Sequence, residues 1–206
     1  MALVRPSWEF PANPDEKYIH NRLFVPLDLA VAAAMLREQG IQTRIIDGHA
    51  LRLRPTEVAT LVKGCDQVFL TSSALDRWEC PNTDIDPFVA CARTLGDKVP
   101  ELYTMGVHGT VRPAEVLRLT GAKAAILGEP ELAIMDIALG KRLDKVPGLC
   151  LPGEGDDESK ARFTGAREEL LDLDETPLPA LDLLPMERYE HVIMGPRSVM
   201  LEASRG

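Results

Sequence analysis

The sequence predicts an α/β fold: a doubly wound, five-stranded parallel sheet with flanking helices, followed by an extended linker. Short apolar runs alternate five times with segments of helical periodicity, which is the order that parallel strands and their crossover helices require. Most of the runs are mainly apolar, as in strands that are covered on both faces. A chain of 206 residues is long enough for one such domain with an appendage.

Each expected strand is a short apolar run that ends at a turn signal, as the second run ends at Asp47-Gly48. The expected helices begin at prolines or follow helical spacing, and Gly40 ends the first of them. The strands are residues 2–4, 42–46, 67–70, 102–105 and 124–127. The helices are residues 25–40, 55–62, 86–95, 113–120 and 130–138.

Beyond Gly140 the alternation weakens. Residues 147–151 favour one more short strand, and residues 153–160 (GEGDDESK) form an acidic segment that is typical of a surface turn. Three prolines exclude a continuous helix over residues 172–185 and favour an extended tether. Residues 198–203 (SVMLEA) predict the first strand of another unit.

We therefore expect three parts in the chain. They are a binding domain over residues 1–150, an acidic turn and proline-rich linker over residues 151–197, and the first strand of a second domain over residues 198–206.

The charge balance limits the possible partners. The chain has 23 Lys and Arg against 32 Asp and Glu, a net charge of -9, and lacks a basic run. Because phosphate binding depends on clustered Lys and Arg, we expect neither nucleic acid nor an anionic membrane as a partner. The longest mainly apolar stretch, residues 25–36, is too short to cross a bilayer, and the first residues do not form a secretory signal, so a cytoplasmic location is expected.

The four cysteines do not have the spacing of a zinc, iron–sulfur or CxxC redox site, and we interpret them as small buried side chains. They are Cys65, Cys80, Cys91 and Cys150.

In an open α/β sheet, ligands bind where the loops after the strands converge, so these loops are the candidate site. They are rich in small and hydroxyl residues and contain neither GxGxxG nor GxxxxGK[ST], so the sequence does not support the usual dinucleotide and P-loop sites. Ser72 and Ser73 are candidates for hydrogen bonds to a ligand's amides, and Gly106 and Gly109 for close approach to a flat ligand. The alternative for the glycines is that they form tight strand-to-helix turns.

The histidines give a second set of candidates. His49 follows the strand that ends at Asp47, where an imidazole can ligate a metal while the carboxylate holds its other nitrogen. His108, between glycines of the fourth loop, is a candidate for contact with a ligand's edge, and His20 and His191 are expected to be exposed or structural. No motif for self-contained hydrolysis stands out, so the chain is expected to hold a ligand rather than to react by itself.

Five segments together resemble the N-terminal cobalamin-binding domain of B12-dependent radical S-adenosylmethionine (SAM) enzymes, over nearly the whole chain. Residues 25–50 resemble that domain's first helix and second strand, and residues 105–117 (MGVHGTVRPAEVL) its glycine–histidine turn. Residues 124–131 (AAILGEPE) are similar to the end of its fifth strand, and residues 178–185 (LPALDLLP) to its tether. Residues 198–206 (SVMLEASRG) resemble the strand before the CxxxCxxC loop that binds a [4Fe–4S] cluster.

The resemblance implies a Rossmann-like domain and a set of cobalamin contacts. Asp47-Gly48-His49 is similar to the DxHxxG motif of cobalamin carriers, in which the histidine is the lower ligand of cobalt, although Arg52 stands at the glycine position. Residues 73–75 resemble the SxL element that lines the pocket of the dimethylbenzimidazole tail. The implied contacts are Asp47, His49, Thr71, Ser72, Ser73, Leu75, Gly106, His108, Gly109, Thr110, Gly128 and Glu129, with His49 as the candidate cobalt ligand.

For a full-length protein, the resemblance implies a methyltransferase that acts on an unactivated carbon. Methylcobalamin would be the methyl donor, and a radical SAM barrel in the same chain would bind the [4Fe–4S] cluster and SAM. The loop over residues 7–24 is expected to cover the upper face of the corrin or to contact substrate; the alternative is an ordinary surface loop. The alternatives are a stand-alone corrinoid carrier, a radical SAM cyclase or ring-rearrangement enzyme, and a non-catalytic α/β signalling module.

Overall fold

The structure, a computed structural model, describes residues 1–8, 24–73, 84–154, 157–168, 172–191, 195–197 and 199. Several sequence predictions fall outside these residues. They concern His20, Leu75, Cys80, most of the loop over residues 7–24 and nearly all of the strand expected at residues 198–203.

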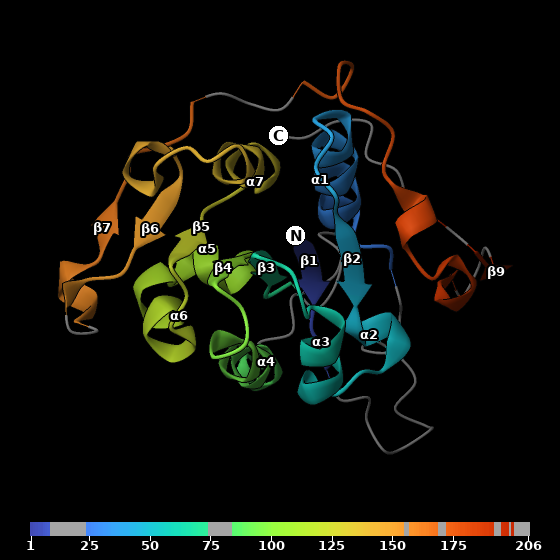
Figure 1. The fold of residues 1–206 in the computed structure, drawn as a ribbon, viewed down its shortest axis with the longest axis horizontal. Coiled ribbons are helices and arrows are strands. Elements are labelled where there is room, and N and C mark those ends of the chain that lie inside the picture. The colour runs from blue at the N-terminus through green and yellow to red at the C-terminus, as the bar shows by residue number, and fades with distance from the viewer. Residues whose placement is uncertain are drawn as a thin grey trace.

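A single sheet of seven strands forms the centre of the fold, in the order β2-β1-β3-β4-β5-β6-β7 (Figure 1). The first five strands in this order are parallel, as predicted, and β6 and β7 are added antiparallel at one edge. The parallel strands are β1 (Ala2–Arg5), β2 (Arg44–Asp47), β3 (Gln67–Thr71), β4 (Glu101–Met105) and β5 (Ala124–Ile126). The edge strands are β6 (Leu149–Leu151) and β7 (Arg162–Phe163).

Helices cover both faces of the sheet, which confirms the doubly wound class. Helices α1 and α7 lie on one face and α3, α4 and α6 on the other (Figure 1). Their bounds are α1 (Leu27–Glu38), α3 (Pro55–Leu61), α4 (Asp86–Gly96), α6 (Pro113–Thr120) and α7 (Glu131–Ala138). Prolines stand within the first two positions of α3, α4 and α6, where the missing amide hydrogen costs no helical hydrogen bond.

Two short helices occupy segments that the sequence analysis assigned to loops. Helix α2 (Gly48–Leu51) begins directly after β2, because the Asp47 carboxylate accepts hydrogen bonds from the backbone amides of His49 and Ala50. Helix α5 (Val107–Val111) follows β4 after Gly106, whose φ of 98° turns the chain. Helices this short leave no periodic pattern in the sequence.

The core has two halves, which follow from the alternation of side chains along each strand. Leu3, Phe69 and Tyr103 pack against α1 and α7, whereas the neighbouring Val4 and Leu70 pack against the helices of the opposite face. The sheet order reverses between β1 and β3, so the loops after these strands diverge at the carboxyl edge.

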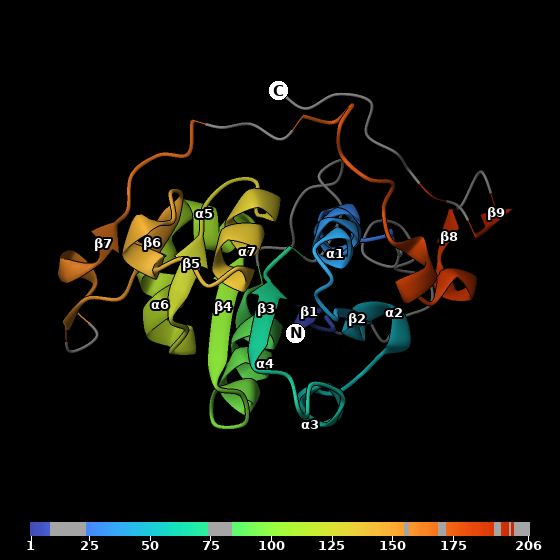
Figure 2. The same cartoon turned by 45° about the horizontal axis from the view of Figure 1, so that its top comes forward.

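The described residues of the segment over positions 172–191 return across α1 instead of extending away from the sheet (Figures 1 and 2). They contain only single 3-10 turns, η4 (Leu181–Leu183) and η5 (Met186–Arg188), before the two-stranded hairpin of β8 (Glu190–His191) and β9 (Gly195–Pro196). The Ala180 amide donates to the Ala30 carbonyl oxygen at 3.0 Å, and the side chains of Leu184 and Tyr189 are buried in the core beside α1.

Within the described ranges, no helix is both long and apolar enough to cross a membrane.

The difference in burial between two phenylalanines predicts how much each stabilises the fold when its side chain is cut back to alanine. Phe69 is fully buried and stacks on Tyr103 with ring centroids 4.9 Å apart, whereas Phe163 lies on the edge strand and is 61% exposed. Phe69→Ala should therefore lower the free energy of unfolding by about 3–5 kcal/mol, and Phe163→Ala should change it by less than about 0.5 kcal/mol. Urea unfolding of both variants checks this, and equal losses would contradict the assigned core.

Candidate functional site

Three hydroxyl groups at the end of β3 and just after it converge on the turn after β4. A side chain at Gly106 would place its Cβ atom 2.8 Å from Ser73 Oγ and 2.9 Å from both Ser72 Oγ and Thr71 Oγ1. With a φ of 98°, Gly106 is therefore required by the packing of these hydroxyl groups as well as by the turn. The tight-turn interpretation of Gly106 holds, and the turn places the three hydroxyl groups beside the start of α5.

Hydrogen bonds join the ends of β3, β4 and β5 into one rim. The Ser72 amide donates to the Met105 carbonyl oxygen at 2.8 Å, and the His108 amide donates to Ser72 Oγ at 3.1 Å. Thr110 Oγ1 donates to the Gly106 carbonyl oxygen and accepts from the Gly128 amide, both at 3.0 Å. These bonds fix the relative positions of the three loops, so a ligand would meet a preformed surface.

The remaining rim residues from the sequence prediction lie on this surface at different depths. Nδ1 of His108 is buried and has no hydrogen-bond partner among the described residues, so the imidazole retains capacity for a ligand. Gly109 is buried against the Ile126 carbonyl oxygen, whereas Gly128 is exposed and Glu129 is half-buried. A cavity of about 470 Å³ opens beside Gly128 and Glu129, lined mainly by apolar groups from α7 and from residues 163–167.

A second group of residues lies where β1 and β2 end, and it is built on a buried ion pair. Arg5 Nε donates to Asp47 Oδ1 at 2.9 Å, and Nη2 of Arg5 donates both to Asp47 Oδ2 and to the Phe24 carbonyl oxygen. The Tyr189 hydroxyl donates to the same Asp47 Oδ2 at 2.6 Å. Asp47 and Tyr189 are 0% exposed and Arg5 is 2% exposed, so the pair is isolated from solvent.

The charges of this cluster are fixed by their surroundings. Burial opposes ionisation of Asp47, but the Arg5 guanidinium and the hydrogen bonds to the carboxylate hold the pKa of Asp47 below its usual range. Burial and the neighbouring Asp47 charge raise the pKa of Tyr189, so its hydroxyl stays protonated and remains a donor. The ion pair is therefore maintained at neutral pH.

His49 lies in the first turn of α2 and is 2% exposed. Its Nδ1 accepts a hydrogen bond from the Trp8 amide at 3.3 Å, and the two rings meet edge to face with centroids 6.1 Å apart. Burial and the positive charge of Arg5 lower the pKa of His49 to about 4, so the imidazole is neutral at pH 7. Ligation of a metal by Nδ1 would have to displace the Trp8 amide.

The expected pairing of Asp47 with the ring of His49 is replaced by other contacts. The carboxylate of Asp47 bonds to Arg5, to Tyr189 and to the backbone amides of α2, including the amide of His49 itself. Arg5 and Tyr189 occupy the carboxylate in place of the imidazole, and the sequence did not indicate either contact. Within the described residues, no group of three or more His, Cys, Asp or Glu side chains is arranged to hold a metal ion.

Sequence reasoning missed Tyr189 and the contacts of Arg5 and Trp8, although it placed Trp8 in the loop over residues 7–24. Arg5 carried a usable signal, since a charged residue that ends an apolar strand beside a buried carboxylate is an ion-pair candidate. The Tyr189 contact spans 142 residues of the chain, and no local pattern indicates such a distant contact. Leu75, the remaining predicted contact, lies outside the described residues.

The chain is similar in sequence to one curated protein and in fold to several solved structures. No family model matches the chain. An uncharacterised methyltransferase, PH0819, of Pyrococcus horikoshii is 29% identical over 174 residues, which cover 80% of this chain and 35% of that protein. The chain thus spans about a third of the length of this curated relative.

Solved structures of two larger proteins share the fold. The cobalamin-dependent SAM radical enzyme OxsB, with aqua-cobalamin and SAM bound, matches 88% of this chain and 24% of its own, with a TM-score of 0.61 and 18% identity. The radical SAM methyltransferase TsrM of Kitasatospora setae, with cobalamin and a [4Fe–4S] cluster bound, matches 96% of this chain and 36% of its own, with a TM-score of 0.55 and 16% identity. What these likenesses establish is the fold.

The buried neutral imidazole predicts a pH dependence of stability. The pKa of His49 is about 4 in the folded chain against an ordinary value of 6.5, so below pH 6.5 the unfolded chain takes up a proton that the folded chain does not. The free energy of unfolding should therefore fall by about 3 kcal/mol from this group between pH 6.5 and pH 4. His49→Gln should remove this component, which urea unfolding at several pH values measures; parallel pH profiles for the two proteins would contradict it.

Proposed function

We propose that this chain binds cobalamin at the carboxyl rim of β3, β4 and β5, as the cobalamin-binding part of a B12-dependent radical SAM methyltransferase. The observation that carries the proposal is the hydrogen-bonded rim of hydroxyl groups, backbone amides and an imidazole. This rim lies on a fold shared with OxsB and TsrM, whose solved structures hold cobalamin.

The chemistry of the rim suits this cofactor. Cobalamin is uncharged overall and carries amide groups around its corrin ring, so it needs neutral donors and acceptors on a surface that is otherwise apolar. Ser73 and the buried Nδ1 of His108 supply such groups. The charges of Arg5 and Asp47 are buried and satisfied by each other, so they impose no charge requirement on a ligand at the rim.

We assign the roles of individual residues as the family resemblance implies. Ser72, Ser73 and Leu75, which lies outside the described residues, are assigned to the nucleotide tail, and Thr71 ends β3 next to Ser72. Gly106, His108, Gly109, Thr110, Gly128 and Glu129 are assigned to the edge of the corrin. The cavity beside Gly128 provides about 470 Å³ for groups at the periphery of the ring.

When bound, cobalamin would supply the methyl-transfer chemistry of its cobalt–carbon bond. The residues of this chain hold the corrin in one orientation and exclude water from its buried side, because their loops are already fixed to one another. In a full-length protein of the size of the relatives, the [4Fe–4S] cluster, SAM and the substrate are proposed to bind outside this chain. The methyl group would be transferred to an unactivated carbon of that substrate. The residues of the rim thus position the cofactor and do not take part in the radical step.

Binding is tested with the purified chain and hydroxocobalamin. After desalting, the chain should retain about one equivalent of corrin, seen in the visible spectrum. Gly106→Ala should weaken binding by about tenfold or more, because its Cβ would displace the three hydroxyl groups that lie 2.8–2.9 Å away. Gly96→Ala, a change made in open space at the end of α4, is the matched control and should bind like the unaltered chain. A folded chain that retains no corrin would overturn the proposal.

The role of His49 is tested separately by the spectrum of the bound corrin. Because Nδ1 accepts the Trp8 amide and the ring is buried, we expect His49→Ala to leave the visible bands of bound hydroxocobalamin unchanged. A shift of these bands in the variant would instead assign the imidazole to the lower face of cobalt.

A further inference from the structure

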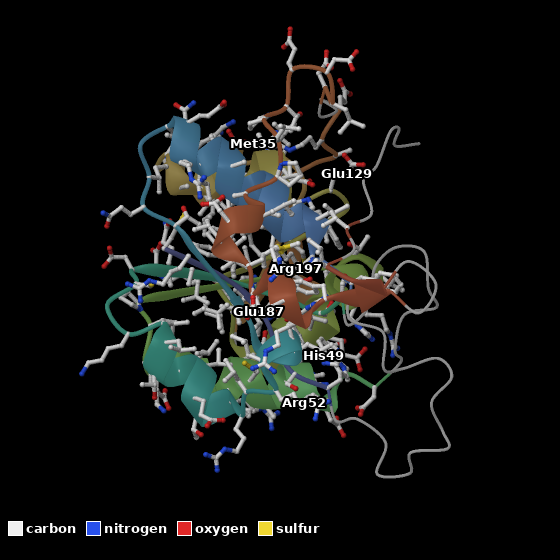
Figure 3. All side chains as sticks on the ribbon, turned by 90° about the vertical axis from the view of Figure 1, so that its right-hand side faces the viewer. Met35, His49, Arg52, Glu129, Glu187 and Arg197 are labelled. Atoms are coloured by element: carbon white, nitrogen blue, oxygen red, sulfur yellow. The ribbon has the colours of Figure 1, made fainter. Side chains whose placement is uncertain are left out.

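Tyr189 connects the returning segment over positions 180–189 to the carboxyl ends of β1 and β2. Its hydroxyl donates to Asp47 Oδ2 at 2.6 Å, although 142 residues separate the two in the chain. Figure 3 looks onto the β2 edge and shows Glu187 and Arg197, on either side of Tyr189 in the sequence, on the same side of the molecule as His49 and α2. The segment therefore lies against the turn that resembles a cobalamin motif.

We infer that Tyr189 is a positioning residue of the cobalamin site, acting through Asp47 on the turn at α2 and on the residues after β1. The inference rests on the proposed function, because the site that Tyr189 positions is the proposed cobalamin site.

A continuous series of hydrogen bonds runs from Tyr189 through Asp47 to the first turn of α2. Oδ2 of Asp47 accepts from Tyr189 and Arg5, while Oδ1 accepts from Arg5 and from the amides of His49 and Ala50 at 3.1 and 3.0 Å. The bonds to both oxygens together set the rotation of the carboxylate. Without the Tyr189 hydroxyl, Oδ2 keeps Arg5 Nη2 as a donor but loses its second donor, so the carboxylate is held less firmly. Oδ1, which accepts the amides of the first turn of α2, is then less restrained, although it keeps its bond to Arg5.

The series continues from α2 to the loop after β1. Nδ1 of His49 accepts from the Trp8 amide, and the Trp8 indole donates to the Asp84 carbonyl oxygen at 2.9 Å, just before α4. A change at Asp47 thus reaches the loops on both sides of the point between β1 and β3 where the strand order reverses. Ligands of open α/β sheets bind at this point, which makes the position of these loops a condition of binding.

The segment is also held by contacts that do not involve Tyr189. The Ala180 amide bonds to the Ala30 carbonyl oxygen, and Leu184 is buried beside α1. The Arg37–Asp182 ion pair is exposed and contributes little. Removing only the Tyr189 hydroxyl should therefore leave the segment in place and disturb Asp47 selectively.

A second buried tyrosine provides a matched control. Tyr103 is 2% exposed, and its hydroxyl donates to Glu101 Oε2 at 2.8 Å. This contact lies near the amino end of β4, at the edge of the sheet opposite the proposed site. Tyr103→Phe and Tyr189→Phe each delete one hydroxyl group that donates to a carboxylate. Tyr103→Phe affects the amino edge of the sheet, and Tyr189→Phe affects the carboxyl edge.

The experiment measures the dissociation constant of hydroxocobalamin at a temperature where all three proteins are folded by circular dichroism. Tyr189→Phe should raise this constant by about tenfold or more, and Tyr103→Phe by less than about twofold. In the same samples, amide exchange at Trp8, His49 and Ala50 should accelerate in Tyr189→Phe alone. Unchanged affinity of Tyr189→Phe, or equal weakening by both variants, would overturn the inference and leave the proposed function standing.

Two further outcomes are decisive. If the unaltered chain does not bind hydroxocobalamin, the proposed function fails and the inference fails with it. If Tyr189→Phe does not fold, the reciprocal measurement on the unaltered chain replaces it, because linked equilibria act in both directions. Hydroxocobalamin should then slow amide exchange at residues 184–189, and unchanged exchange there would overturn the inference.

Discussion

The structure at the carboxyl ends of β1 and β2 depends on a carboxylate that is buried without access to water. Asp47 ends β2, begins α2 and receives the charge of Arg5 from the neighbouring strand. A buried charge is costly unless it is paired and fully hydrogen-bonded, and here five donated hydrogen bonds share its two oxygens. Tyr189 supplies one of these hydrogen bonds, and its burial beside Asp47 holds the segment before β8 against the sheet.

Two kinds of polar group lie along the carboxyl edge of the sheet, one charged and one neutral. Charged groups at the ends of β1 and β2 are used to hold the chain together, whereas the ends of β3, β4 and β5 present hydroxyl groups, amides and the imidazole of His108. The proposed cobalamin site uses the second group, and the inferred role of Tyr189 links the position of the cofactor to the first. The proposed function and the role of Tyr189 both follow from this division.

The order of the five parallel strands and of the longer helices between them was predictable, because buried parallel strands and their crossover helices have distinct patterns. Helix α6 begins and ends at the predicted residues, Pro113 and Thr120. The short helices α2 and α5, and strand β7 with only two residues, were not predictable, since each depends on a cap or a pairing partner rather than on periodicity. At the site, the rim loops were found from the ends of strands, but the Tyr189 contact depends on packing between distant segments.

The central claim is that the carboxyl rim of β3, β4 and β5 receives a corrin, and the position of cobalt tests it most directly. A crystal of the chain grown with hydroxocobalamin allows cobalt to be located by its anomalous scattering. The account predicts one cobalt site over this rim, within reach of the turns at Gly106 and Gly128. A cobalt site at the amino edge of the sheet, or well-ordered crystals grown with hydroxocobalamin that contain no cobalt, would contradict it.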